Sequence, residues 1–140
     1  MIVLDTNVTS ELMKPAPSAD VVRWVREQST ADLYTTSITL AEIGYGIQRL
    51  TDGRRKDLLR AAADEVFSAF ADHVLAFDAA AATRYGQIVS HRDSMGTPID
   101  GFDAQLASIC QAHDAALATR NVKDFEETGI AVVDPWHDRL

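Results

Sequence analysis

The first seven residues, MIVLDTN (residues 1–7), place a short apolar run directly before three polar side chains. The Ile-Val-Leu run at 2–4 is typical of a short buried strand. Asp5 follows at its end, and parallel sheets bind ligands beyond the carboxyl ends of their strands. Asp5 is equally suited to capping the helix that follows. Because Thr6 and Asn7 are also good capping residues, we assign the cap to these neighbours and a binding role to Asp5.

The rest of the chain alternates short apolar runs with helical patterns, and no linker or repeat interrupts it. Strands that alternate with helices indicate a mostly parallel sheet between two helical layers. We therefore predict a three-layer α/β/α sandwich with about five strands, formed by one domain over residues 1–140. The further strands are expected at 32–37, 73–78, 115–119 and 130–136, and the helices at 8–13, after Ser18, and at 39–50, 54–71, 79–93 and 99–113.

The composition limits the compartment and the partners. The 140 residues carry a formal net charge of −8, which argues against non-specific binding to a polyanion unless a bound cation supplies positive charge. Cys110 is the single cysteine, so no intrachain disulfide is possible, as expected in a reducing compartment. The start lacks a basic region, and no apolar run approaches the ~20 residues that cross a bilayer. We expect a cytoplasmic protein without a membrane partner.

Polar side chains also follow or precede the other expected strands. Because the carboxyl ends of parallel strands share one edge of a sheet, we expect four segments to bring these side chains together with Asp5. Hard cations such as Mg²⁺ and Mn²⁺ prefer such oxygen ligands. The side chains at these positions are Glu42, Asp100, Asp103, Arg120, Asn121 and Asp124.

The carboxylates near helix starts also have purely structural explanations. Asp100 and Asp103 have the spacing of a capping box, and a helix dipole favours Glu42. We assign the cap to Asp100 and a metal to Asp103, since Asp103 borders an apolar stripe where a partly desolvated carboxylate needs a cation. That stripe is expected to comprise Phe102, Leu106, Ile109, Cys110 and His113.

Asp5, Glu42 and Asp103 together supply the ligand set for a hard cation. A metal held in this way polarises a phosphodiester and activates water, and Glu42 or Asp103 can orient that water as a base. The pattern predicts metal-assisted hydrolysis of a phosphate ester. It does not distinguish a nucleic acid from a small substrate.

Three arginines are candidates for contacts with substrate phosphates. Arg120 directly follows the strand at 115–119, beside the acidic end of the sheet. Arg54 and Arg55 belong to the most basic run of the chain. A salt-sensitive phosphate contact and an ordinary solvated helix surface both explain that run.

Five stretches together resemble the PIN-domain ribonucleases, and more narrowly the VapC and FitB-like toxins of bacterial toxin–antitoxin pairs. Each stretch alone is a weak signal, but together they follow the order and spacing of the family along essentially the whole chain. The stretches are MIVLDTNVTSEL (1–12), SITLAEIGYGIQRL (37–50), IDGFDAQLASIC (99–110), LATRNVKDF (117–125) and DPWHD (134–138).

The resemblance implies an endoribonuclease that depends on Mg²⁺ or Mn²⁺. It also implies a homodimer that is inhibited by a small DNA-binding antitoxin, so that DNA is bound only through the antitoxin complex. The family acids correspond to Asp5, Glu42 and Asp103, and the supporting pair beside the first acid corresponds to Thr6 and Asn7. An arginine from the antitoxin is expected to enter the acidic pocket.

One position departs from the family. Many members carry an acid where this chain has Asn121. Asparagine still hydrogen-bonds a metal-bound water but removes a charge, so we expect a single firmly held metal. Asp124 lies one helical turn further along the chain and could replace the missing acid only from a distance.

Two other functions are also compatible with the sequence. A small-molecule phosphohydrolase of the haloacid dehalogenase kind also has an acid after its first strand, but it needs a second Asp where this chain has Asn7. The other alternative is a catalytically weak module that binds RNA or protein. The RNA target is not defined by the sequence, and candidate dimer surfaces are Trp24, Tyr45 and the helix at 54–71.

Overall fold

The computed structural model describes residues 1–137, and Asp138, the last residue of the DPWHD stretch, lies outside the described residues. The strands are β1 (Ile2–Leu4), β2 (Leu33–Thr36), β3 (Val74–Leu75), β4 (Ala116–Ala118) and β5 (Val132–Val133). The helices are α1 (Thr6–Leu12), α2 (Ala19–Glu27), α3 (Ser37–Gln48), α4 (Arg54–Ala69), α5 (Ala79–Ser94) and α6 (Gly101–Ala112), with short 3-10 turns η1 (Thr30–Asp32) and η2 (Val122–Phe125).

The five strands form one sheet in the order β3-β2-β1-β4-β5, and all four pairings are parallel. After β1 the chain builds β2 and β3 on one side and then crosses back to β4 and β5 on the other side. The strand order therefore changes direction between β1 and β4. Ligands bind at this kind of switch point in open α/β sheets.

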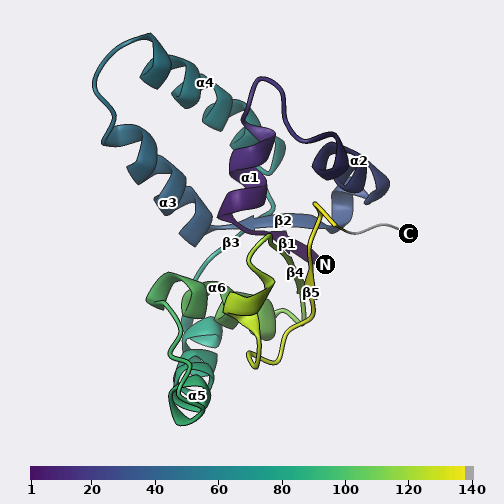
Figure 1. Cartoon of the computed structure of the whole chain (residues 1–140), viewed down its shortest axis with the longest axis vertical. Helices are drawn as coiled ribbons and strands as arrows, with labels where there is room; N and C mark the ends of the chain where they lie inside the picture. The colour runs from purple at the N-terminus through teal and green to yellow at the C-terminus, as the bar shows by residue number, and fades with distance from the viewer. Residues whose placement is uncertain (138–140) are drawn as a thin grey trace.

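Helices cover both faces of the sheet, with α1 to α4 on one face and α5 and α6 on the other (Figure 1). Successive side chains of each strand point to opposite layers. Val3 and Leu117 pack in the cluster with α5 and α6, while Leu4 and Ala118 pack in the cluster with α1 and α2. The predicted three-layer α/β/α sandwich is confirmed.

Side-chain caps move two helix starts from the positions that the sequence predicted. Asp5 caps α1, which therefore begins at Thr6 instead of residue 8. The Thr36 hydroxyl accepts from the backbone N–H of Thr39, so α3 begins at Ser37 instead of residue 39. Glu42 consequently lies in the second turn of α3. The helix dipole stabilises a carboxylate mainly in the first turn, so it does not explain Glu42.

The expected apolar stripe of α6 is wrong at both ends. Phe102 is 51% exposed, and His113 is also exposed. Asp100 caps α6 so that Phe102 falls in its first turn, at the surface. Leu106, Ile109 and Cys110 are buried as expected, and the small side chains of Ala104 and Ala107 extend this buried face and allow α6 to pack closely against its neighbours.

Two further expectations change with the packing. Trp24 is only 4% exposed and packs against Leu4 and Val21, so it is not available to form a dimer surface. Tyr45 is 69% exposed and is available to form one. The third strand spans two residues instead of the six expected at 73–78. Among the helices described here, none has both the length and the apolar character needed to cross a membrane.

Candidate active site

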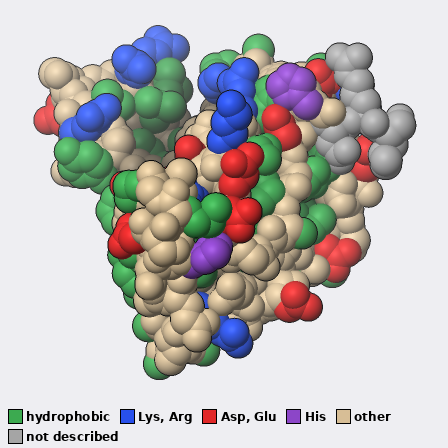
Figure 2. Space-filling view, turned by 60° about the horizontal axis from the view of Figure 1, so that its bottom comes forward, with side chains coloured by type: hydrophobic (Ala, Val, Ile, Leu, Met, Phe, Trp, Pro, Cys, Tyr) green, Lys and Arg blue, Asp and Glu red, His purple; other side chains and the backbone are tan. Residues whose placement is uncertain are grey.

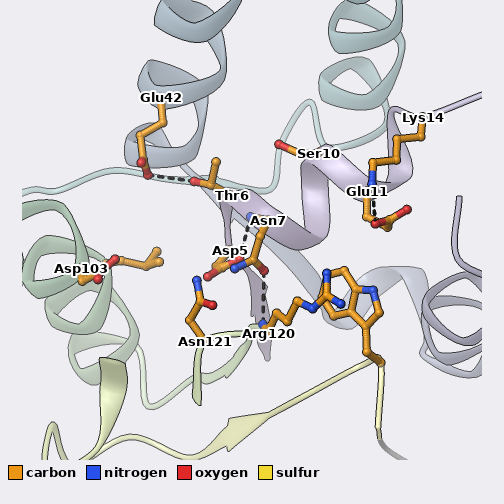
Figure 3. A pocket seen from close by; sticks show the side chains of 12 residues that line it. Asp5, Thr6, Asn7, Ser10, Glu11, Lys14, Glu42, Asp103, Arg120 and Asn121 are labelled. Carbon is orange, nitrogen blue, oxygen red and sulfur yellow. Dashed lines mark hydrogen bonds and ion pairs between the residues drawn. The ribbon is translucent and has the colours of Figure 1, made fainter. Parts of the chain in front are cut away.

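The carboxyl edge of the sheet opens into a cavity of about 420 Å³ (Figure 3). Figure 2 shows acidic side chains gathered near the middle of one face of the molecule, next to basic ones. The cavity receives residues from α1, α3, α6 and the segments that follow β4 and β5. Its lining residues are Asp5, Thr6, Asn7, Ser10, Glu11, Lys14, Glu42, Asp103, Leu106, Arg120, Asn121 and Trp136.

Asp5 stands at the end of the central strand and is only 5% exposed. Its Oδ1 accepts from the backbone N–H groups of Asn7, at 2.8 Å, and Val8, at 3.4 Å. Its Oδ2 accepts from the Thr119 hydroxyl at 2.6 Å. Burial raises the pKa of Asp5 to about 6, although these hydrogen bonds oppose the shift. Asp5 thus both caps α1 and lines the cavity.

The assignment of the α1 cap to Thr6 and Asn7 is therefore wrong. Their side chains instead connect α1 to two other segments of the site. The Thr6 hydroxyl donates to Oε1 of Glu42 at 2.8 Å, and Oδ1 of Asn7 accepts from the backbone N–H of Arg120 at 3.2 Å. An Asp at the N-cap position leaves the two following side chains available for these contacts.

Asp100 and Asp103 take the roles that their spacing suggested. Oδ2 of Asp100 accepts from the backbone N–H groups of Phe102 and Asp103, so Asp100 caps α6 from an exposed position. Asp103 is partly buried and lines the cavity. Burial, followed by the charges of Asp100 and Asp124, raises the pKa of Asp103 to about 6. Figure 3 shows Asp103, Asp5 and Glu42 approaching the same space from three elements.

The structure separates the remaining predicted residues. Asn121 lines the cavity. Asp124 is exposed on η2 and does not line it, but its charge contributes to the raised pKa of Asp103. Arg54 and Arg55 lie at the start of α4 and line a different, mostly apolar groove beside Met13. These two arginines are therefore not placed to contact a phosphate in the acidic cavity.

Sequence reasoning missed Thr119 and the pair formed by Glu11 and Lys14. Leu4 pairs with Ala118 in the parallel register of β1 and β4, so the next residues, Asp5 and Thr119, are neighbours. The sequence holds no signal for this register, so Thr119 could not be found from the sequence alone. Glu11 is 7% exposed and accepts from Lys14 Nζ at 3.0 Å, which is the main reason that the pKa of Glu11 is lowered.

The fold and the cavity define an α/β domain that gathers carboxylates at the switch point of a parallel sheet. The family model of the PIN domain matches residues 2–131, and the chain belongs to this family. Ribonucleases of the PIN-domain family generally use a divalent metal ion. The match confirms the family that the five sequence stretches predicted.

Two curated relatives are similar over nearly their full lengths. The chain is 36% identical to Toxin FitB of Neisseria gonorrhoeae, covering 99% of this chain and 100% of that protein. It is 36% identical to VapC ribonuclease Y4jK of Sinorhizobium fredii, with 97% and 98% coverage. The solved structure of FitAB bound to the IR36 DNA fragment superposes with a TM-score of 0.92 at 35% identity, covering 100% of this chain and 99% of that one. These names confirm the predicted class, a ribonuclease of a toxin–antitoxin pair.

Proposed function

We propose that this chain, acting as a single PIN domain over residues 1–140, is the metal-dependent endoribonuclease toxin of a toxin–antitoxin pair. The observation that carries the proposal is the meeting of Asp5, Glu42 and Asp103 from three separate elements in one cavity. Burying Asp5 and partly burying Asp103 costs free energy, and no Lys, Arg or His of residues 1–137 is among the groups that shift the pKa of either carboxyl. Such a cluster fits a site that is selected for its chemistry.

Mg²⁺ or Mn²⁺ fits the donors of this cavity, which are carboxylate and amide oxygens without thiolate or imidazole. Within residues 1–137, no three His, Cys, Asp or Glu side chains are close enough to enclose an ion by themselves. This agrees with the habit of Mg²⁺, which keeps several waters and takes one or two carboxylates together with substrate phosphate. The sequence predicted Glu42 as a third ligand; because no three such side chains of the described residues are close enough, we propose Asp5 and Asp103 as the ligands, with Glu42 nearby. The chemistry that it supplies is positive charge against the developing negative charge of a phosphodiester.

The protein groups around the acids have distinct tasks. Thr119 and the first turn of α1 donate to Asp5 and favour its ionised form against burial. Thr6 holds Oε1 of Glu42, while no described residue hydrogen-bonds Oε2. We therefore assign to Oε2 of Glu42 the acceptance of a proton from the attacking water. The amide of Asn121 orients that water without adding charge.

The proposed partners follow from the relatives. Because similar proteins are named as a toxin and a ribonuclease, and one was solved as FitAB on DNA, we propose an RNA substrate and a cognate antitoxin that contacts DNA. A homodimer is consistent with the exposed apolar side chains of Leu40, Tyr45 and Phe102. We propose that the protein acts in the cytoplasm, where the machinery of translation and its RNAs are found.

Cleavage of an end-labelled RNA by the purified chain tests this proposal. We expect cleavage with Mg²⁺ or Mn²⁺, its loss with EDTA, and a loss of at least about 100-fold in Asp5→Asn and Asp103→Asn, since each removes a charged metal ligand. The control is Asp64→Asn, which removes the same charge from an exposed position of α4. RNA binding without cleavage by the parent chain would identify a binding module instead. Cleavage that persists in EDTA would contradict the proposed dependence on a metal ion.

A further inference from the structure

The cavity is divided into two ends of opposite charge. Asp5, Glu42 and Asp103 lie on one side of Asn7, and Arg120 lies on the other with the ion pair of Lys14 and Glu11, so that end carries a net positive charge (Figure 3). The proposed chemistry uses the acidic end and leaves the basic end without a role. A polymer substrate continues beyond the cleaved bond, so the basic end is where an adjoining nucleotide would lie.

Arg120 is held in place but keeps its charge available. Its backbone N–H donates to Oδ1 of Asn7 at 3.2 Å, and its guanidinium lies over the Trp136 ring, with Cζ 4.9 Å from the ring centre, so the outer face of the guanidinium is the surface open to a base. Of the carboxylates in residues 1–137, none forms an ion pair with Arg120. The neighbouring carboxylate of Glu11 is hydrogen-bonded by Lys14 and by the backbone of Ser18, and the charge of Arg120 is only the last of the causes that lower the pKa of Glu11. A planar guanidinium that is held in position without an ion pair is suited to binding a phosphate group.

Trp136 is fixed by the core on one side and lines the cavity on the other. Its backbone N–H donates to Oδ1 of Asp134 at 2.9 Å, and the preceding Pro135 is fully buried. Its ring packs against the apolar cluster that contains Leu4 and Val21. An anchored aromatic ring beside an arginine is the usual platform on which proteins stack unpaired bases.

We infer that Arg120 and Trp136, with Lys14 at the rim, form a subsite for the nucleotide that adjoins the cleaved bond of single-stranded RNA. In this subsite, Arg120 binds the phosphate and the base stacks on the platform that its guanidinium and the indole form. The inference rests on the proposed function. An acidic protein segment would use the guanidinium but has no need of the indole, so the indole favours RNA. Trp136 thereby acquires a role in substrate binding.

Anisotropy of a fluorescent single-stranded RNA hexamer of random sequence tests the subsite. All variants are made in Asp5→Asn, which keeps the probe intact. Base stacking on an aromatic ring contributes about 1–3 kcal/mol, so Trp136→Leu and Arg120→Gln are expected to weaken binding about 5- to 100-fold. Trp136→Phe retains a smaller platform and is expected to weaken binding less. Arg55→Gln removes the same charge outside the cavity and serves as the matched control.

Two more readouts separate the subsite from a structural role. The hexamer is expected to quench tryptophan emission, and this quenching should disappear in Trp136→Phe, since the other tryptophan, Trp24, is buried. The combined Arg120→Gln and Trp136→Leu variant should lose less affinity for the hexamer than the product of the two single fold-losses. This is expected because the two side chains form one surface. Arg120→Gln changes an exposed side chain, so it tests the subsite even if Trp136→Leu does not fold.

The outcomes distinguish the subsite from the function on which it rests. If Arg120→Gln and Trp136→Leu bind the hexamer as strongly as the Asp5→Asn protein does while the parent cleaves RNA, the subsite is overturned and the nuclease stands. If both variants lose binding or quenching while the parent cleaves nothing, the subsite stands and the nuclease is overturned. If the subsite variants lose no more affinity for the hexamer than Arg55→Gln does, the loss comes from the overall charge of the protein. That result would also overturn the subsite.

Discussion

The hydroxyl of Thr119 donates a hydrogen bond of 2.6 Å to Oδ2 of Asp5. The two residues directly follow the paired ends of β4 and β1, and both are buried. Thr119 Oγ1 also accepts from the backbone N–H of Asn121 at 3.0 Å, so the same hydroxyl holds the loop that carries Asn121. One side chain thus orients a proposed metal ligand and the segment opposite it.

Thr119→Val is expected to weaken binding of Mn²⁺ about 10- to 100-fold, the usual effect of removing a hydrogen bond from a metal ligand. Valine has nearly the shape of threonine but leaves Oδ2 of Asp5 without a donor, which raises the pKa of Asp5 further and favours its protonated form. Calorimetric titration with Mn²⁺ at pH 7 measures the change. Thr119→Ser keeps the hydroxyl and should retain most of the affinity; equal losses in both variants would contradict this role.

Asp5→Asn is expected to stabilise the metal-free protein at neutral pH. Folding raises the pKa of Asp5 from 3.8 to about 6, so between these values the folded state binds more protons than the unfolded state. Stability therefore falls as pH rises through this window, by up to about 3 kcal/mol for this group at about 1.4 kcal/mol per unit. Asparagine carries no charge and escapes this cost.

Urea unfolding with EDTA at pH 4 and pH 7.5 measures that effect. The parent and Asp5→Asn should differ little at pH 4, and the variant should be more stable at pH 7.5. Asp64→Asn, on the exposed face of α4, should behave as the parent at both values. A difference between parent and Asp5→Asn that is the same at both pH values would contradict the assigned cause.

Asn121→Asp is expected to add a second metal. In the parent, Asn121 lines the cavity without a charge, and we expect one firmly bound Mn²⁺. A carboxylate at this position adds a hard oxygen ligand that favours a divalent ion. Calorimetry should give one site in the parent and two in the variant. Two sites in both proteins would show that the asparagine does not set the stoichiometry.

Arg92→Met is expected to lower the free energy of unfolding by about 2–4 kcal/mol, because it leaves buried carbonyl groups without donors. Arg92 is 7% exposed, and its guanidinium donates to the carbonyl oxygens of Thr97 at 2.7 Å, Asp124 at 2.8 Å and Glu126 at 3.1 Å. It thereby joins the loop before α6 to η2. Urea unfolding measures the loss, with Arg84→Met on the exposed face of α5 as the control. A change under about 0.5 kcal/mol, the usual size for surface sites, would contradict the prediction.

The ends of strands were the part of the site that sequence could predict. Asp5 follows β1, and Glu42 lies on the helix that follows β2, so a parallel sheet alone brings them to one edge. Asp103 was predictable because Asp100 supplies the cap and leaves Asp103 to border the core. The alternation of short strands and helices likewise predicts the three layers without any detail of packing.

The remaining features depend on distances that a linear pattern does not contain. Thr119 meets Asp5 only through the register of β1 with β4, across more than a hundred residues of chain. Phe102 has the spacing of a core residue, yet small neighbours on α6 take the buried face. Arg54 and Arg55 form the most basic run, but α4 carries them to a different groove from the acids. Local charge predicts an attraction to phosphate without predicting where the phosphate lies.

Translation makes β1, the middle strand, first, whereas its neighbour β4 begins at Ala116 of a chain of 140 residues. A polypeptide released before that point has Asp5 but lacks Thr119, Arg120 and Trp136, and its sheet has no strand on one side of the centre. Such a fragment therefore cannot assemble the cavity, so the proposed nuclease activity requires the part of the chain from β4 onward.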